Sequence, residues 1–248
     1  MTQTWTAAGY ERNGRFVAEL AGDVFAMLDA GPGQRILDLG CGDGALTRRI
    51  QDSGARVTGV DSSPELIQSA QSKGLDVLLC SGEQLPFKQD FDAVFSNAAL
   101  HWMLDQDAVL EGVHNALRPD GRFVAEMGGH GNIAAIRVAL SVAVEPFNID
   151  AESAGANIFF TAAEYADMLQ RHGFRVDVIG LVPRPTALPT GIEGWLRTFR
   201  RSLLDQLSVD DQRLVITRVS ELLRPILCDR SGHWFADYVR LRFRALAT

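Results

Sequence analysis

The chain has 248 residues, a formal net charge of −7 and a hydrophobic content of 46%. This composition predicts a globular protein with a sizeable core and excludes a strongly basic surface for nucleic acid. No apolar run approaches the roughly 20 residues of a membrane helix, and Met1-Thr2-Gln3-Thr4 lacks a signal-sequence pattern, so we expect a cytoplasmic protein with no membrane partner.

The first predicted elements are a helix, a strand and a second helix. Hydrophobic spacing predicts a helix over residues 11–30, which Gly31-Pro32-Gly33 ends. The strand Ile36–Leu39 follows and runs into Gly40-Cys41-Gly42-Asp43-Gly44, after which a second amphipathic helix begins.

Strands and helices then continue to alternate. Ser63 and Pro64 have the residue types of a helix N-cap and first helical position. Further strands are predicted at 57–60, about 75–80, 91–96 and 122–127, with a helix at about 105–117. This alternation predicts an α/β fold with a doubly wound, mostly parallel sheet.

One more helix and strand follow this alternating region. Thr161-Ala162-Ala163-Glu164 has the pattern of a capping box, and Gly173 ends the helix that it opens. The strand Phe174–Val182 comes next and completes a sixth αβ unit.

The last part of the chain changes character. Pro183, Pro185 and Pro189 are expected to break the chain, and about 192–228 is predicted to be helical. Residues 234–247 alternate in a way that fits a strand or a helix, and we favour a strand.

We therefore predict a single domain over residues 1–248. Its predicted parts are an N-terminal helical segment (1–30), a ligand-binding core (31–182), a helical cap (190–230) and a final strand (234–247). The cap is thus expected to be inserted before the last strand.

The glycine turn after the first strand predicts a nucleotide-like ligand. Gly tolerates unusual dihedral angles and lets a ligand approach the backbone, and the next helix points unpaired N–H groups at the same place. Gly40-x-Gly42-x-x-Ala45 also fits the dinucleotide fingerprint. Asp38 lies in a strand that is expected to be buried, so its carboxylate needs a donor from a ligand or a loop. The alternative is a glycine turn without a ligand.

Other candidate residues follow the neighbouring strands, whose carboxyl ends meet at one edge of the sheet. Asp61 lies about 20 residues beyond the turn, the spacing of an acid that binds a ribose, although a surface N-cap is an alternative. The loops Ser81–Phe87 and Asn97–Trp102 are expected to converge on the same crevice.

Cysteine spacing and charge add two expectations. Cys41, Cys80 and Cys228 are odd in number and lack metal-site spacing, so we predict neither a disulfide framework nor a metal site. Residues 1–174 hold 12 basic and 23 acidic residues, whereas 175–248 hold 12 arginines and 8 acidic residues. Arginine suits carboxylate or phosphate binding, but its recurrence at helical spacing favours a solvated helix face.

Five blocks of this sequence resemble class I S-adenosylmethionine-dependent methyltransferases over about residues 30–182. The blocks are Asp38–Gly44, Gly59–Asp61, Leu85–Phe87, Phe91–Ser96 and Leu117–Arg122. A narrower resemblance, to the methyltransferase type 11 group that includes small-molecule enzymes similar to trans-aconitate methyltransferase, is carried by Ser96–Trp102, Gly128–Asn132 and Arg184–Thr186.

The resemblance implies a Rossmann-like sheet with an antiparallel final strand, S-adenosylmethionine as cofactor and S-adenosylhomocysteine as product. It assigns cofactor-binding roles to Tyr10, Asp38, Gly40, Gly42, Gly44, Asp61, Ser62, Ser81, Gly82, Glu83 and Asn97. Asp38 would meet the methionine ammonium and Asp61 the ribose diol. Tyr10 would cover the cofactor, with core packing as the alternative.

One position departs from the family pattern. Ser81 stands where an Asp often faces the adenine amino group, which would weaken that contact by about 0.5–1.5 kcal/mol. Glu83 or Gln84 is expected to compensate, or the backbone alone to hold the base.

Catalysis by such an enzyme is mainly alignment of acceptor, methyl group and sulfur. His101 and His130 are candidate general bases, with a structural or substrate-shaping role as the alternative. A carboxylate acceptor would need no base, and Trp102, Arg184 or Arg197 would then bind it. The predicted cap is a candidate lid over the acceptor.

Three hypotheses remain open from the sequence. The first is methyl transfer to a small organic acceptor, at a carboxylate or hydroxyl oxygen. The second is a nicotinamide-dependent oxidoreductase, which Asp38 and the lack of a Tyr-x-x-x-Lys pair after the fourth strand disfavour. The third is a non-catalytic binding or scaffold protein. The acceptor and the oligomeric state are not determined by the sequence.

Overall fold

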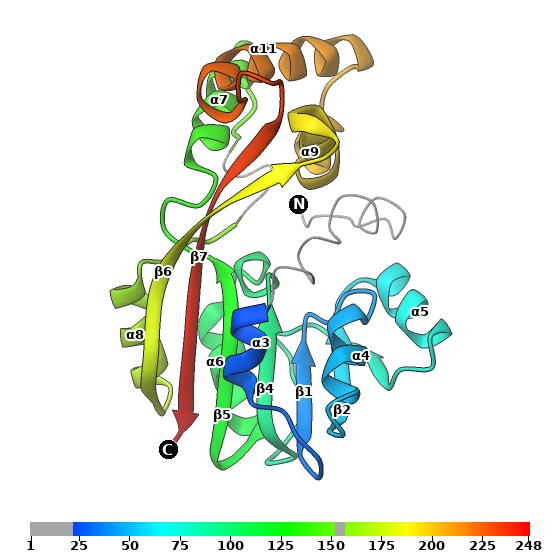
Figure 1. The fold of residues 1–248 in the computed structure, drawn as a ribbon, viewed down its shortest axis with the longest axis vertical. Helices are drawn as coiled ribbons and strands as arrows, with labels where there is room; N and C mark the ends of the chain where they lie inside the picture. Colours follow the sequence, from blue (N-terminus) through cyan, green and yellow to red (C-terminus); the bar gives the residue numbers. More distant parts are fainter. Residues whose placement is uncertain (1–21, 152–156) are drawn as a thin grey trace.

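The sheet has seven strands in the order β3-β2-β1-β4-β5-β7-β6 (Figure 1). The computed structural model describes residues 22–151 and 157–248. The strands are β1 Arg35–Leu39, β2 Arg56–Asp61, β3 Val77–Leu79, β4 Phe91–Asn97, β5 Leu117–Gly128, β6 Phe174–Leu188 and β7 Trp234–Ala247. Strands β1 to β5 pair in parallel, and β7 is antiparallel to both β5 and β6. The predicted sheet with its antiparallel final strand is confirmed.

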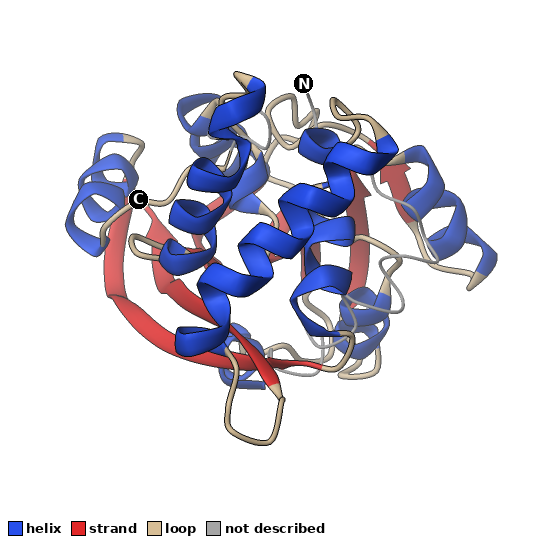
Figure 2. Cartoon of the chain, turned by 90° about the horizontal axis from the view of Figure 1, so that it is seen from above, coloured by secondary structure: helices blue, strands red, loops and turns tan. Residues whose placement is uncertain are grey.

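Helices flank this sheet (Figure 2) and build a second lobe beyond it (Figure 1). They are α3 Gly22–Leu28, α4 Ala45–Gln51, α5 Pro64–Ser72, α6 Gln106–Ala116, α7 Ala134–Val144, α8 Ala162–Arg171, α9 Gly191–Phe199, α10 Arg201–Leu204 and α11 Val209–Leu227, with 3-10 turns η1 Leu100–Trp102 and η2 Glu145–Phe147. The predicted caps are confirmed: Ser63 accepts a hydrogen bond from Leu66 N–H, and Thr161 and Glu164 form a capping box.

The two faces of the sheet bury alternate residues of each strand. Val24 and Leu28 of α3 pack with Ile36 and Phe95 on one face. The helices α6 and α8 cover the opposite face, where Tyr165 packs against the core. Asp38 has the same parity as Ile36, so its side chain lies on the face that α3 and α4 cover.

A second hydrophobic core forms the upper lobe in Figure 1. It joins α7, α9, α10 and α11 to the distal halves of the long strands β6 and β7, with Trp195, Leu196, Val219 and Tyr238 buried. Three of these helices lie between β6 and β7 in the sequence, where we predict helices. The contribution of α7 is not anticipated by the sequence reasoning.

Strand β7 changes its buried face between the two lobes. Ala236 and Tyr238 are buried in the upper core, whereas Leu241 and Phe243 are buried in the lower core. Because side chains alternate along a strand, these two pairs point to opposite faces. Arg240 is the last residue before the change, so it lies at the junction of the lobes.

The expected chain break at Pro183 and Pro185 is wrong, because β6 continues to Leu188. An edge strand pairs on one side only, so a proline whose nitrogen faces outward removes no ladder hydrogen bond. Strand β6 is such an edge strand, next to β7. Only Pro189 lies beyond its end.

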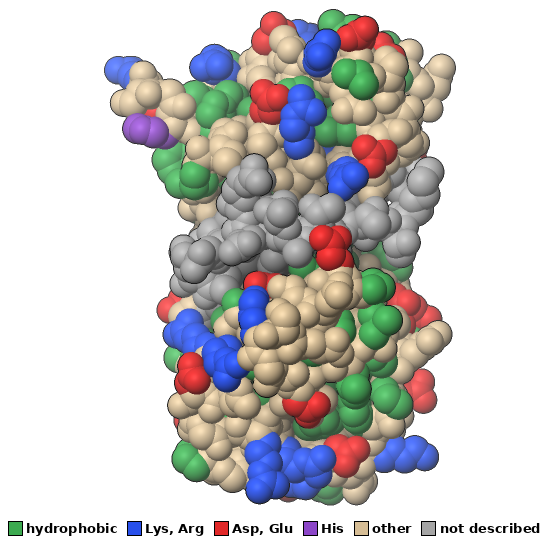
Figure 3. Space-filling view, turned by 90° about the vertical axis from the view of Figure 1, so that its right-hand side faces the viewer, with side chains coloured by type: hydrophobic (Ala, Val, Ile, Leu, Met, Phe, Trp, Pro, Cys, Tyr) green, Lys and Arg blue, Asp and Glu red, His purple; other side chains and the backbone are tan. Residues whose placement is uncertain are grey.

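Two further observations concern the N-terminal region and the surface. Of the helix expected at 11–30, the structure describes α3, whereas residues 11–21 lie outside the described part. Figure 3 shows acidic and basic side chains interspersed on the face that it presents. Within residues 22–151 and 157–248, no helix is long and apolar enough to cross a membrane.

The lower core predicts a large cost for removing Phe243. Its ring centroid lies 5.0 Å from that of Phe123 and 5.3 Å from that of Tyr165, and its side chain is fully buried. We expect Phe243→Ala to lower the free energy of unfolding by about 3–5 kcal/mol, measured by urea denaturation. Leu214→Ala is the control, because Leu214 is 63% exposed and its loss should cost little. Equal effects of the two substitutions would contradict this placement of the core.

Candidate functional site

The glycine turn after β1 takes a conformation that suits glycine and leaves no room for side chains. Gly40, Gly42 and Gly44 have φ angles of +77°, +56° and +83°. A Cβ atom on Gly40 would collide with the Cβ of Ala99, and one on Gly44 with a methyl group of Leu75. The predicted turn is therefore packed directly against the loop after β4.

Asp38 is a buried carboxylate beside this turn. It is 2% exposed, and its Oδ2 accepts a hydrogen bond of 2.6 Å from the Thr47 hydroxyl of α4. Burial raises the pKa of Asp38 to about 7, the charge of Asp61 adds to the rise, and the Thr47 bond opposes it. Among the described residues no cation pairs with Asp38, so the structure leaves a place for a cationic ligand group.

Asp61 joins the end of β2 to the glycine turn. Its Oδ2 accepts the Gly42 N–H at 2.9 Å, and its Oδ1 accepts the Ser63 N–H at 2.9 Å. Burial raises the pKa of Asp61, while hydrogen bonds from the Ser63, Gly42 and Ser62 backbones oppose the rise. The structure thus brings Asp38, Asp61 and the turn together, as the sequence predicts.

The loop after β3 completes one side of this site. Gly82 packs closely against Met103 and Leu39, and the Ser81 hydroxyl accepts the Glu83 N–H at 3.2 Å. The Glu83 carboxylate accepts the Asp105 N–H at 3.0 Å, so it is directed toward the start of α6. The expectation that Glu83 compensates for Ser81 is therefore not supported, and Gln84 is exposed.

The loop after β4 forms the adjoining wall. The Ser96 hydroxyl donates to the Leu39 carbonyl at 2.8 Å, which ties the end of β4 to the glycine turn. Asn97 is buried at the end of the strand. Ala98 has a φ of +56°, and its N–H donates to the Glu126 carbonyl at 2.7 Å.

His101 lies in the turn that follows this wall. It is buried, and its Nδ1 accepts the Gly128 N–H at 3.2 Å. Burial, together with the charges of Arg240 and Arg200, holds the pKa of His101 well below its usual value. The neutral ring therefore carries its proton on Nε2 and has no vacant lone pair, which favours the structural or substrate-shaping alternative over the role of a general base. The Trp102 ring lies 5.3 Å from it.

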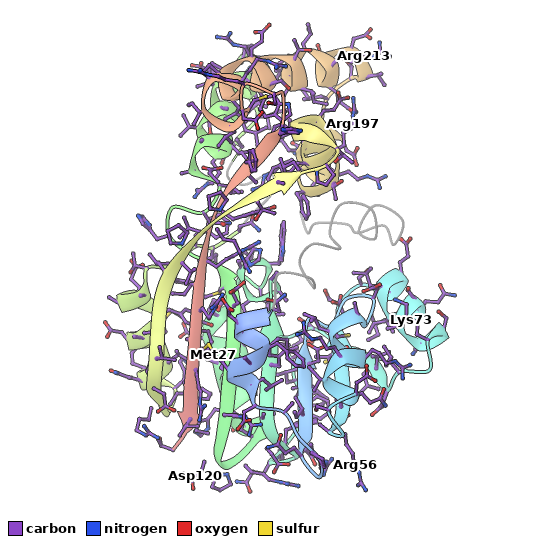
Figure 4. All side chains as sticks on the ribbon, in the orientation of Figure 1. Met27, Arg56, Lys73, Asp120, Arg197 and Arg213 are labelled. Carbon is purple, nitrogen blue, oxygen red and sulfur yellow. The ribbon has the colours of Figure 1, made fainter. Side chains whose placement is uncertain are left out.

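The other three residues expected in the acceptor site have different surroundings. His130 is exposed and lies near Glu164 of α8, and its role as a general base stays a prediction. Arg184 forms an ion pair with Glu126. Arg197 is exposed on α9 and pairs with Glu193 at 2.9 Å, so the structure does not bring it to the site (Figure 4). Tyr10 lies outside the described residues.

Sequence reasoning missed two buried arginines near His101. Arg240 is 4% exposed, and its guanidinium lies 4.3 Å from the centroid of the Tyr238 ring. Within the described part of the chain it has no carboxylate partner, and its Nε has no hydrogen bond. Arg200 donates to Asn157 Oδ1 at 3.1 Å and stacks on Trp195. A sequence signal for Arg240 exists, because it lies on the same face of the strand as Ala236 and Tyr238. This alternation would have predicted that Arg240 is buried.

Comparison with known proteins gives the family. A profile described as a methyltransferase domain matches residues 37–125. An uncharacterized methyltransferase of Schizosaccharomyces pombe is 36% identical, and the match covers 97% of both chains. The chain belongs to the S-adenosylmethionine-dependent methyltransferases. This family assignment replaces the oxidoreductase and non-catalytic alternatives.

Two further relatives are similar to this methyltransferase. The trans-aconitate 2-methyltransferase of Deinococcus radiodurans is 30% identical over 77% of both chains. The solved structure of an S-adenosylmethionine-dependent methyltransferase from Mesorhizobium loti matches with a TM-score of 0.56 and 23% identity, covering 92% of this chain and 97% of that one. The structural match shows the same fold.

The residues of the methyltransferase site fit S-adenosylmethionine. The cofactor has an ammonium group, which suits the buried carboxylate of Asp38, with which no cation of residues 22–151 and 157–248 pairs. Its ribose diol suits Asp61, whose carboxylate lies at the carboxyl end of β2. The glycine turn has positive φ angles at Gly40, Gly42 and Gly44, the backbone conformation of a turn that a nucleotide-like ligand approaches closely.

The close packing of Gly40 predicts that even a methyl group is harmful there. We expect Gly40→Ala to weaken S-adenosylhomocysteine binding at least tenfold and to destabilise the protein. Gly74→Ala is the matched control, because Gly74 has a φ of +72° but nothing within 4 Å of its missing Cβ. The control should cost only about 1–2 kcal/mol of backbone strain. Calorimetric titration and urea denaturation of both variants check this, and equal affinity would refute it.

The buried charge of Asp38 predicts a pH-dependent stability. Its pKa is raised from 3.8 to about 7, so between these two pH values the folded protein binds a proton that the unfolded chain has lost. The free energy of unfolding of the ligand-free protein therefore falls as the pH rises through this interval. Asp38→Asn should therefore stabilise the ligand-free protein by about 1–4 kcal/mol at pH 8, and by less at pH 5.

Urea denaturation of wild type and variant at both pH values measures this difference. Asp76→Asn is the control, because Asp76 also accepts a hydrogen bond from a threonine hydroxyl but is exposed. A difference between wild type and Asp38→Asn that does not grow with pH would contradict the buried, unpaired state of Asp38.

Proposed function

We propose that the protein transfers the methyl group of S-adenosylmethionine to a carboxylate oxygen of a small organic acid. The observation that carries this proposal is Arg240, a buried cation that has no carboxylate partner among the described residues and that acts on His101. An acceptor with a negative charge would supply the missing partner. The name of the Deinococcus relative, a trans-aconitate methyltransferase, supports an acid as substrate.

The state of His101 favours a carboxylate over a hydroxyl acceptor. A hydroxyl group must lose its proton to become a good nucleophile, whereas a carboxylate is already ionised at neutral pH. The Nδ1 lone pair of His101 is engaged by Gly128, so this ring cannot take that proton. Its Nε2–H is instead a donor for a carboxylate oxygen.

The chemistry requires positioning rather than acid–base catalysis. When bound, S-adenosylmethionine supplies an activated methyl group on a sulfonium. A lone pair of the acceptor oxygen forms the bond to the methyl carbon, the electron pair of the carbon–sulfur bond goes to sulfur, and no proton moves. In this proposal Asp38 and Asp61 orient the donor, while Arg240 and His101 orient the acceptor.

The product class provides a direct test of this function. Incubation with methyl-labelled S-adenosylmethionine and a panel of carboxylic acids should yield products that release labelled methanol on mild alkaline treatment, because methyl esters hydrolyse under alkaline conditions. Matched alcohols, phenols and amines serve as controls. Labelled products that are stable to alkali would overturn the assignment to a carboxylate oxygen.

A comparison of two arginines tests the role of Arg240. Arg240→Met should lower kcat/KM for the acid about 100-fold, because the acceptor charge loses its partner. S-adenosylhomocysteine affinity should stay within threefold. Arg197→Met is the control, because Arg197 is exposed and paired with Glu193. Kinetics that are equal for the two variants would refute the assignment of Arg240 to the acceptor.

A further inference from the structure

We propose that Glu126 is a positioning residue, which engages Arg184 and Arg242 and so leaves Arg240 as the arginine that binds the acceptor. This inference rests on the proposed function, because it assumes a carboxylate acceptor. Glu126 lies in β5 and is 1% exposed. Its carboxylate is thus a buried charge that has the two arginines of β6 and β7 as partners.

The contacts of Glu126 use both of its oxygens. Oε1 accepts from Arg184 of β6, and Oε2 accepts from the Nε of Arg242 of β7 at 2.8 Å. Arg242 also reaches Asp23 of α3 at 3.1 Å. The Glu126 carboxylate therefore links β5 to β6 and β7, the two strands that continue into the upper lobe.

The three arginines of this junction lie within electrostatic range of one another. Burial, followed by the charges of Arg240 and Arg242, lowers the pKa of Arg184 to about 10. Arg184 and Arg242 are paired with Glu126, whereas Arg240 has no such pair in the described part of the chain. A single buried carboxylate thus determines which of the three cations is left for a ligand.

The register of the sheet places Glu126 between the cofactor wall and the arginines. Asn97 of β4 is paired with Glu126, and Glu126 is paired with Arg242. Two residues farther along, Gly128 is paired with Arg240 and donates to His101. Glu126 and Gly128 are two residues apart and share one face of β5. The Glu126 carboxylate therefore lies next to the strand position, Gly128, that is paired with Arg240 and hydrogen-bonded to His101.

Loss of the Glu126 charge should release competing binding groups. Arg184 and Arg242 are 19% and 15% exposed, so a small anion can compete for either side chain when the Glu126 charge is removed, although Arg242 keeps its ion pair with Asp23. An acceptor bound to either arginine would be displaced from the methyl group. Such non-productive binding lowers kcat and KM by the same factor and leaves kcat/KM unchanged. A merely structural loss would instead raise KM or lower kcat/KM.

The experiment is a kinetic comparison of wild type and Glu126→Gln with an acid that the wild type esterifies. We expect kcat and KM for the acid to fall together by threefold or more, kcat/KM to stay within twofold, and S-adenosylhomocysteine affinity to be unchanged. The double variant Glu126→Gln/Arg184→Gln should move both parameters back toward wild type. A raised KM, a proportional loss of kcat/KM or unchanged kinetics would overturn the inference.

Arg184→Gln alone keeps the inference testable if Glu126→Gln does not fold. Because Arg184 is held by Glu126, its loss should leave KM for the acid within twofold of wild type. A tenfold rise would show that Arg184 binds the acceptor and would overturn the inference. A wild-type protein that esterifies no acid overturns the proposed function as well, whereas active wild type with a raised KM in Glu126→Gln overturns only the role of Glu126.

Discussion

A buried charge without a partner is the constraint on which this site depends. Moving one ion out of water costs several kcal/mol unless an opposite charge compensates. Asp38 and Arg240 are both almost fully buried, and neither has an ion-pair partner in the described part of the chain. By contrast, Glu126 is compensated by Arg184 and Arg242. The signs of the two unpaired charges favour a cationic group on the donor and an anionic group on the acceptor.

The construction of β7 explains how Arg240 comes to be buried although the described residues give it no carboxylate partner. The strand buries Leu241 and Phe243 in the sheet and Tyr238 in the upper lobe, so Arg240 lies where one core ends and the next begins. Hydrophobic burial on both sides holds the arginine in place although none of the described residues supplies a counter-ion for it. The packing of the two cores thus offsets the free-energy cost of burying the charge of Arg240.

Local patterns predicted the donor side of the site better than the acceptor side. Asp38, Asp61 and the glycine turn follow from spacing within a short stretch of chain, and the structure brings them together. The surroundings of Arg184 and His101 could not be predicted, because their partners, Glu126 and Gly128, are distant in sequence and become neighbours only in the folded sheet. Strand order likewise decides that prolines are tolerated in β6.

Proton release on ligand binding reports whether Asp38 receives the ammonium group of the cofactor. At pH 7 Asp38, with its pKa of about 7, is partly protonated in the ligand-free protein, and an ammonium group beside it would expel that proton. Calorimetric titration with S-adenosylhomocysteine in buffers of different ionisation enthalpy should therefore show proton release on binding, and the release should decrease as the pH is raised from 6 to 8. Asp38→Asn should release no proton on binding. Wild-type binding without proton release would contradict the assignment of Asp38 to the ammonium group.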